Sequence, residues 1–145
     1  MNGNVIIIGA GRVGSSIARL LNEQNYHVTI VDKYKDALLN VEDFTGYFEV
    51  ADASNIEVLQ RIGIGNADVV VISTEDDDTN VFLTDVCHFV FGIPQIFVRL
   101  ADPQKEKLCR YPSVRAILPF LLSLDEFRRE FGEVRESAPS RAFRG

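Results

Sequence analysis

Short apolar runs alternate six times with segments of helical periodicity along this chain of 145 residues. Several of the runs are continuous in Val and Ile, which is typical of strands in a parallel sheet covered on both faces. The predicted strands span residues 4–8, 28–31, 47–50, 69–73, 96–100 and 114–118. The predicted helices span residues 13–24, 35–40, 55–62, 79–91, 103–110 and 124–131.

Strict alternation of strands and helices implies right-handed crossovers and predicts an α/β fold with a doubly wound parallel sheet. For six strands the commonest order is 3-2-1-4-5-6, so we expect a single-domain Rossmann sheet. We expect the folded domain to cover residues 1–131. Residues 132–145 combine charged, Ser, Pro and Gly residues with little periodic apolar content, which predicts a disordered polar tail.

Polar residues at the predicted helix starts support these boundaries. Ser54 with Glu57, and Ser123 with Glu126, have the Ser-x-x-Glu spacing of a capping box. Asp76 opens an acidic run before the fourth helix, where carboxylates satisfy free N–H groups and favour the helix dipole. We therefore expect each of these positions to mark the start of a helix.

Charge and composition exclude several classes of protein. The net charge of −6 argues against a nucleic-acid partner, because a binder of phosphate backbones carries a basic surface. No apolar run reaches the roughly 20 residues needed to span a bilayer, so we expect a cytoplasmic protein. Cys87 and Cys109 lack Cys-x-x-Cys spacing, and His27 and His88 have no second ligand at metal spacing. We expect neither a disulfide nor a metal site.

The first Gly-rich turn carries the clearest chemical signal. The segment Gly9-Ala10-Gly11-Arg12-Val13-Gly14 follows the first strand and opens the first helix, which is the context that a dinucleotide-binding motif requires. Gly9 permits the tight turn, Gly11 lets a pyrophosphate approach the backbone, and Gly14 allows close helix–strand packing. The N–H groups and dipole of the following helix then hold the anion.

Charged residues around this turn narrow the ligand. Asp32 ends the second strand about 20 residues after Gly11, where a carboxylate accepts hydrogen bonds from ribose hydroxyls. It repels a 2′-phosphate, so NAD, NADH or an unmodified adenine nucleotide (ATP, ADP or AMP) is favoured over NADP, although Lys33 partly offsets that repulsion. Arg12 is either a bidentate phosphate ligand or a solvated loop arginine.

Other candidate ligands follow the remaining strands. Asp52 and Ala53 come after the third strand, where they line the adenine side of the crevice or form an ordinary turn. Ser73 and Thr74 end the fourth strand at the carboxyl edge, where ligands bind in open α/β sheets, or form a plain loop. Arg99 ends the fifth strand and faces the same crevice or makes a structural ion pair.

The sequence offers no catalytic group beside this crevice. We find no G-x-S-x-G, no Walker lysine, and no His, Lys or Tyr positioned as an acid or base. The acidic residues 75–78 fit helix-start charge better than metal ligation. We therefore expect a binding protein and not an enzyme. The alternatives are a small NAD-dependent oxidoreductase without its own substrate domain, and a scaffold with a vestigial turn.

Two late segments carry more apolar side chains than one sheet face needs. The fourth helix includes Phe82, Phe89 and Val90, and we expect it to be buried on two sides. Residues 118–131 add Phe120, Phe127 and several Leu residues. This excess predicts an interface with a partner, and the alternative is a large intramolecular core.

Taken together, these motifs resemble the nucleotide-binding N-terminal domain of TrkA/KtrA-type regulators of potassium conductance (RCK, or TrkA-N, domains). The resemblance covers residues 4 to about 118 and rests on the following segments: Gly9–Gly14, Ile30-Val31-Asp32, Ala51-Asp52-Ala53-Ser54, Ser73-Thr74-Glu75-Asp76-Asp77-Asp78-Thr79-Asn80 and Val98-Arg99-Leu100. Two positions depart from the family pattern. The residue before Asp52 is Ala51, where the family usually has glycine. The segment after the sixth predicted strand is Pro119-Phe120-Leu121-Leu122, where the family commonly has Ser-Pro-Glu.

The resemblance implies a cytoplasmic regulatory subunit, peripheral to the inner face of the membrane. Such domains assemble as homo-dimers or larger rings beneath an integral-membrane potassium channel or transporter subunit, and exchange of NAD(H) or ATP/ADP gates the pore. The family's ligand contacts fall on Gly9, Gly11, Arg12, Gly14, Asp32, Lys33, Asp52, Ala53, Ser73 and Arg99. No RCK C-terminal domain follows in this sequence, which leaves a split subunit or a shortened chain as alternatives.

Overall fold

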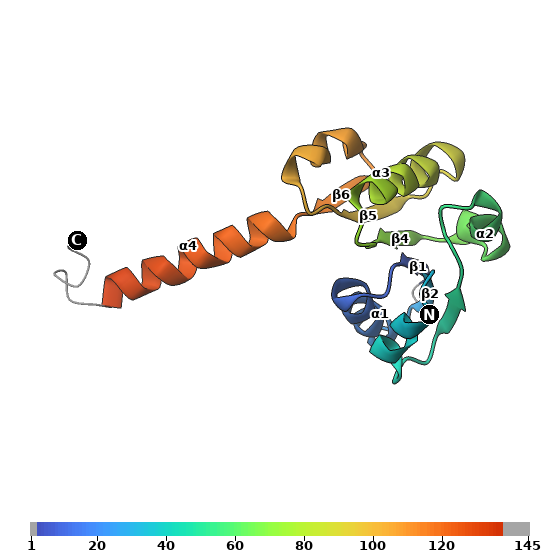
Figure 1. The fold of residues 1–145 in the computed structure, drawn as a ribbon, viewed down its shortest axis with the longest axis horizontal. Coiled ribbons are helices and arrows are strands. Elements are labelled where there is room, and N and C mark those ends of the chain that lie inside the picture. Colours follow the sequence, from blue (N-terminus) through green and yellow to red (C-terminus); the bar gives the residue numbers. More distant parts are fainter. Residues whose placement is uncertain (1–2, 138–145) are drawn as a thin grey trace.

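A single sheet of six parallel strands forms the centre of the molecule (Figure 1), and the computed structural model describes residues 3–137. The strand order is β3-β2-β1-β4-β5-β6 and every pairing is parallel. The strands are β1 Asn4–Ile8, β2 His27–Asp32, β3 Tyr47–Val50, β4 Val69–Ile72, β5 Gln95–Arg99 and β6 Val114–Ile117. The predicted α/β fold, doubly wound with this order, is confirmed.

The helical segments connect these strands and differ in type more than the sequence predicts. The α-helices are α1 Arg12–Glu23, α2 Ile56–Arg61, α3 Asp77–Asp85 and α4 Pro119–Ser137. The 3₁₀ segments are η1 Lys35–Val41, η2 Ile64–Asn66 and η4 Pro103–Cys109, and η3 Val86–Val90 is a π-helical turn. The predicted helix 79–91 is thus an α-helix followed by a π-turn. The periodic apolar pattern does not distinguish these helix types.

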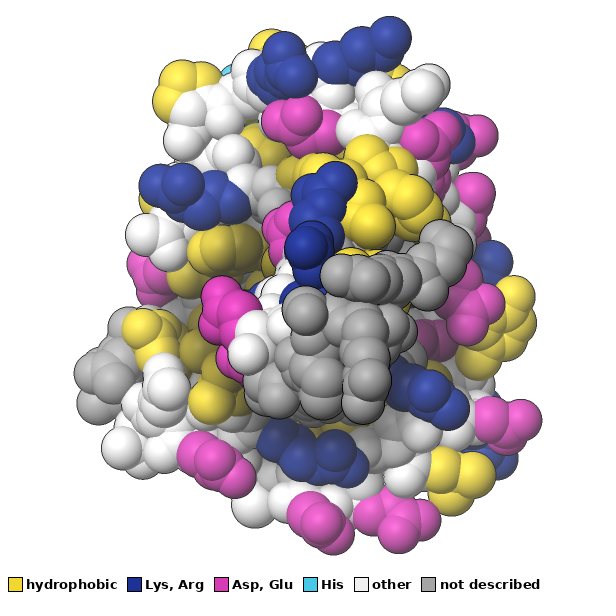
Figure 2. Space-filling view, turned by 90° about the vertical axis from the view of Figure 1, so that its left-hand side faces the viewer, with side chains coloured by type: hydrophobic (Ala, Val, Ile, Leu, Met, Phe, Trp, Pro, Cys, Tyr) yellow, Lys and Arg dark blue, Asp and Glu magenta, His cyan; other side chains and the backbone are white. Residues whose placement is uncertain are grey.

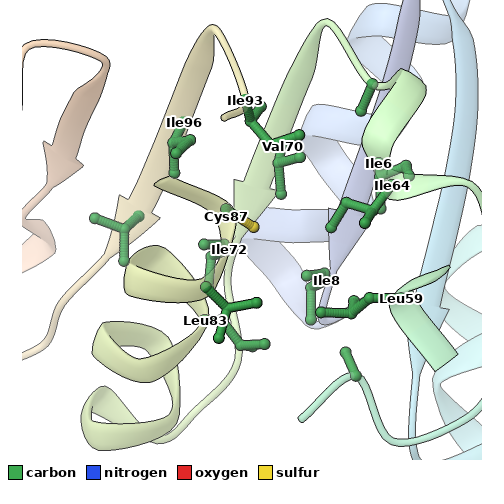
Figure 3. Packing of buried hydrophobic residues seen from close by; sticks show 14 of the residues in the cluster. Ile6, Ile8, Leu59, Ile64, Val70, Ile72, Leu83, Cys87, Ile93 and Ile96 are labelled. Atoms are coloured by element: carbon green, nitrogen blue, oxygen red, sulfur yellow. The ribbon is translucent and has the colours of Figure 1, made fainter. Parts of the chain in front are cut away.

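Two apolar clusters cover the two faces of the sheet. On one face Val5, Ile7 and Ile30 pack with Ala18 of α1 and Val41 of η1. On the other face, strand residues pack against Leu59 of α2, Leu83 of α3 and Cys87 of η3 (Figure 3). Successive residues of β1 therefore point into opposite clusters. This burial on both faces explains the continuous Val and Ile runs.

Only one of the predicted helix-start signals works as expected. Asp76 is the N-cap of α3 and accepts a hydrogen bond from the Thr79 N–H at 3.2 Å. The N-cap of α2 is Asn55 and not Ser54, because Ser54 donates instead to Asp52. Ser123 lies inside α4, since that helix begins at Pro119. Both capping-box predictions were wrong. Ser54 hydrogen-bonds to Asp52 instead of capping α2, and α4 begins before Ser123.

Helix α4 departs most from the sequence prediction. It runs over Pro119–Ser137, whereas the sequence predicts a helix only over 124–131, and it projects away from the sheet (Figure 1). Residues 132–137 are therefore helical and not part of a disordered tail. The rest of the predicted tail, residues 138–145, lies outside the described residues. No helix within residues 3–137 is long and apolar enough to cross a membrane.

The prediction that the fourth helix is buried on two sides is also wrong for this chain alone. Leu83 and Cys87 are buried against the sheet, but Phe82, Phe89 and Val90 are exposed. Figure 2 views the molecule from the side on which α4 projects and shows hydrophobic side chains at the surface among basic and acidic ones. The apolar excess lies on the surface because no segment of the described chain packs over it.

Candidate functional site

A crevice of about 680 Å³ opens at the carboxyl edge of the sheet, where strands β1, β2, β3, β4 and β5 end. This volume lies in the range of small-molecule sites, and the carboxyl edge is where open α/β sheets bind ligands. The crevice is lined by all but one of the predicted site residues: Gly9, Gly11, Arg12, Val13, Asp32, Lys33, Asp52, Ala53, Ser73, Thr74 and Arg99. The exception is Gly14.

The three glycines of the first turn have different structural roles. Gly9 has a φ of +98°, and a Cβ there would lie 2.5 Å from the Ser73 carbonyl oxygen. A Cβ on Gly14 would lie 1.9 Å from the Gly9 carbonyl oxygen, so Gly14 permits the close contact of α1 with the turn. A Cβ on Gly11 would meet nothing within 4 Å. Gly11 therefore leaves a free approach to the backbone on the crevice side.

Asp32 holds the turn in place from the neighbouring strand. One carboxylate oxygen accepts a hydrogen bond from the Ala10 N–H at 2.8 Å, and the other accepts one from the Tyr34 N–H at 2.7 Å. Each oxygen keeps a second lone pair for another donor, such as a ribose hydroxyl. Asn40 supports the same turn because its side-chain amide donates to the Ala10 carbonyl at 2.9 Å.

Asn40 was missed in the sequence, and no local signal marks it. It lies at the end of η1 in an apolar stretch, and only the tertiary fold brings it to the turn 30 residues earlier. The sequence prediction for Asp32 concerned its ribose contact. Its hydrogen bonds to the backbone N–H groups of Ala10 and Tyr34 were not predicted.

Asp52 forms a local turn and faces the crevice as well, so the two alternatives open from the sequence are compatible. Its carboxylate accepts hydrogen bonds from the Ser54 hydroxyl at 2.6 Å and the Ser54 N–H at 3.0 Å. These bonds, the hydroxyl bond first, hold the pKa of Asp52 below its ordinary value. Asp52 is therefore an ionised acceptor on the β3 side of the crevice.

The β4–β5 side of the crevice contains Thr74 and Arg99. A guanidinium nitrogen of Arg99, Nη1, donates to the Thr74 carbonyl at 3.4 Å, whereas Nε is buried and has no hydrogen-bond partner among residues 3–137. None of the salt bridges in this part of the chain involves Arg99, which removes support for a structural ion pair. Arg99 thus brings a cationic group to the crevice wall with a donor to spare.

The acidic residues after β4 act in the fold. Asp76 caps α3, and Asp77 accepts hydrogen bonds from the backbone N–H groups of Ala101 and Asp102 at 2.8 and 2.9 Å. Asp78 forms a salt bridge with Lys105. Within the described residues, no group of three or more His, Cys, Asp or Glu side chains could hold a metal ion. Helix capping and loop attachment account for these carboxylates.

This architecture, a Gly-rich turn at the switch point of a doubly wound sheet, defines a nucleotide-binding Rossmann-type domain. Residues 5–118 match the TrkA-N domain family, and the chain belongs to that family. A Trk system potassium uptake protein TrkA of Mycobacterium tuberculosis is 33% identical over 104 residues, which cover 72% of this chain and 47% of the relative. The chain thus spans about half the length of the curated relatives that it matches.

Solved structures share the fold. The NAD(P)-binding domain of an exopolyphosphatase-related protein from Archaeoglobus fulgidus has a TM-score of 0.75 at 20% identity, and the match covers 91% of this chain and 99% of that one. The AMP-bound Kef C-terminal domain of Shewanella denitrificans has a TM-score of 0.65 at 26% identity, covering 79% and 71%. The GsuK channel bound to NAD has a TM-score of 0.66 at 20% identity, covering 82% and 22%.

Proposed function

We propose that this chain is a nucleotide-binding regulatory subunit of a potassium transport system. It binds NAD(H) or an adenine nucleotide in the crevice and acts from the cytoplasmic face on an integral-membrane channel or transporter subunit. The observation that carries the proposal is the turn at Gly11, which is unobstructed and lines the same crevice as Asp32 and Arg12. The relatives' role as potassium uptake proteins supports the transport system as the target.

The crevice offers complementary groups for the parts of such a ligand. The free N–H groups at the start of α1, with Arg12, suit a phosphate or pyrophosphate. Asp32 has lone pairs for the ribose hydroxyls, and its charge disfavours a 2′-phosphate. Structural relatives bound to AMP and to NAD support both a mononucleotide and a dinucleotide in this fold. We propose that Asp32, Asp52 and Ala53 face the adenosine half.

Regulation without catalysis is the mechanism we propose for this chain. A ligand shifts a conformational equilibrium only by the difference between its affinities for the two states. The crevice walls come from five different strands, so a ligand that contacts Gly11, Asp32 and Arg99 links elements far apart in sequence. Ligand exchange would then favour one arrangement of the assembled subunits and so open or close the pore.

We further propose that the regulatory unit is a homo-dimer, or a ring built from dimers, in which α4 contacts a second copy. Large apolar side chains recur every three or four residues along α4 and form one stripe: Phe120, Leu124, Phe127, Phe131 and Val134. All of them are exposed; Phe127, for example, is 61% accessible. Most helical stability in proteins comes from packing of an apolar face, so we propose that the exposed stripe of α4 packs on a partner surface.

A second copy supplies that surface. The exposed Phe82, Phe89 and Val90 of α3 and η3 form a second apolar patch on the same chain. Within one chain α4 points away from α3, so the stripe and the patch do not cover each other (Figure 1). In a symmetric dimer, the α4 stripe of each chain would contact the apolar patch of the other chain, so the same contact would form twice. This reciprocity favours a second copy as the occupant.

Direct binding tests the proposed function. Isothermal titration with NADH, NAD, ATP, ADP and AMP should give saturable binding for at least one ligand, and mass spectrometry of the purified protein identifies a retained nucleotide. Asp32→Ala should weaken that binding about tenfold or more, as expected for the loss of charge-assisted hydrogen bonds. Asp43→Ala, an exposed position that does not line the crevice, is the matched control. Absence of binding for all five ligands at millimolar concentration would refute the proposal.

A further inference from the structure

Asn80 is the most completely hydrogen-bonded side chain beside the crevice, although it does not line it. It lies in the first turns of α3 and is fully buried. Its amide nitrogen donates to the carbonyl oxygens of Thr74 at 3.0 Å and Arg99 at 2.8 Å. Its amide oxygen accepts from the Thr74 N–H at 3.2 Å and from the Thr74 hydroxyl. One side chain thus joins the ends of β4 and β5.

Asparagine is the side chain that suits this position. The site offers two carbonyl acceptors on one side and two donors of Thr74 on the other, and a carboxamide has two N–H donors and an oxygen with two lone pairs. A carboxylate would face the two carbonyl oxygens without a proton to donate. Leaving buried carbonyls unpaired is unfavourable, so the local structure depends on an amide here.

A second contact from α3 strengthens the same attachment. Asp77 accepts hydrogen bonds from the N–H groups of Ala101 and Asp102, directly after β5. The end of β5 is therefore attached to α3 at Arg99 itself and again at the two residues Ala101 and Asp102. The Arg99 guanidinium lines the crevice, and Nη1 donates to the Thr74 carbonyl at 3.4 Å.

We propose that Asn80 is a positioning residue for the β4–β5 half of the crevice. It sets the main chain of Thr74 and Arg99 so that the guanidinium of Arg99 can bind the part of a nucleotide beyond the first phosphate. This inference rests on the proposed function. It adds that Asn80 discriminates by ligand length: a dinucleotide or nucleoside diphosphate depends on Asn80, whereas AMP, held by the turn and Asp32, does not.

The test compares Kd values for NADH, ADP and AMP in the full chain and in Asn80→Asp. We expect the Kd for NADH and ADP to rise about tenfold, the effect of about one lost charge-assisted hydrogen bond, and the Kd for AMP to change less than about twofold. In Arg99→Ala, adding Asn80→Asp should weaken NADH binding less than about twofold further, because Asn80 acts through Arg99.

Thr84→Val is the matched control for a purely structural effect. Thr84 is buried in the same helix and does not line the crevice, and its hydroxyl donates to the Asn80 main-chain carbonyl at 2.8 Å. We expect it to lower the melting temperature and to leave all three Kd values unchanged. Conversely, equal weakening of AMP and NADH by Asn80→Asp would overturn the proposal, because a merely structural role predicts that result.

Asp77→Asn keeps the proposal testable if Asn80→Asp does not fold. This variant removes one of the two carboxylate acceptors for the loop after Arg99. Its Kd for NADH should rise while its Kd for AMP stays nearly unchanged. An unchanged NADH affinity in a folded variant contradicts the inference. If the wild-type chain binds none of the five nucleotides named above, the proposed function fails and the inference fails with it. If the wild type binds these nucleotides and the variants weaken NADH and AMP binding equally or not at all, only the inference fails.

Discussion

Gly14 and Gly11 belong to one motif, but the backbone around them demands glycine for different reasons. A Cβ on Gly14 would collide with the Gly9 carbonyl, a backbone group that cannot rotate away. We expect Gly14→Ala to lower the free energy of unfolding by about 1–3 kcal/mol, as overpacking in a close contact does. Urea denaturation followed by circular dichroism measures this change.

The control for that prediction is Gly11→Ala, since its Cβ meets nothing within 4 Å. We expect its unfolding midpoint to match the wild type within error, while its nucleotide affinity falls because the methyl group occupies the approach of the pyrophosphate. Equal destabilisation by both substitutions would mean that the turn is packed differently from the structure described.

The Asp52 carboxylate provides a pH-dependent prediction. Its pKa is lowered first by the Ser54 hydroxyl and then by the Ser54 N–H. A lowered folded-state pKa gives stability that is present above the ordinary carboxyl pKa and lost as the pH falls through the folded-state value. Ser54→Ala should therefore raise the Asp52 pKa and move this loss of stability to higher pH. Carbon-13 NMR titration of the carboxyl group measures the shift, and Ser54→Thr, which keeps the hydroxyl, should retain the low value.

At the level of elements, the π-helical turn η3 buries Cys87 in the apolar cluster on one face of the sheet. Burial raises the pKa of the Cys87 thiol to about 12, and it raises that of Cys109 as well. Because the thiolate is the reactive form, we expect neither cysteine to react with Ellman's reagent at pH 8 in the native protein. Both should react at once in 6 M guanidinium. Rapid reaction of Cys87 in the native state would show that the segment around η3 opens locally.

The elements also show which parts of the fold were predictable from sequence. Strands such as β1 and β4 were predicted to within a residue because their side chains are buried on both faces and read as continuous apolar runs. The full length of α4 was not, because Gly132 and the charged residues after it indicated a polar tail, although they lie inside the helix. In the site, Asp32 follows from its spacing to the turn, but Asn40 and Asn80 act through tertiary hydrogen bonds that no local pattern encodes.

For the whole molecule, the decisive question is what covers α4. The residues of its apolar stripe are exposed, and Phe127 stacks on Phe131 within the stripe. Burying an exposed Phe side chain contributes roughly 1.5–3 kcal/mol, so a stripe of several such residues favours association strongly. We expect the chain to sediment as a dimer or a larger even-numbered assembly at micromolar concentration in analytical ultracentrifugation.

Phe127→Glu tests whether that assembly depends on the stripe, because it places a charge in the middle of the proposed interface, where desolvation is costly. We expect it to shift the sedimenting species to the monomer and to lower the helix content, since α4 loses its partner surface. Arg129→Ala, on the opposite face of the same helix, removes only a salt bridge to Glu126 and should remain associated. A wild-type monomer, or a Phe127→Glu variant that remains associated, would show that α4 is not the dimer contact.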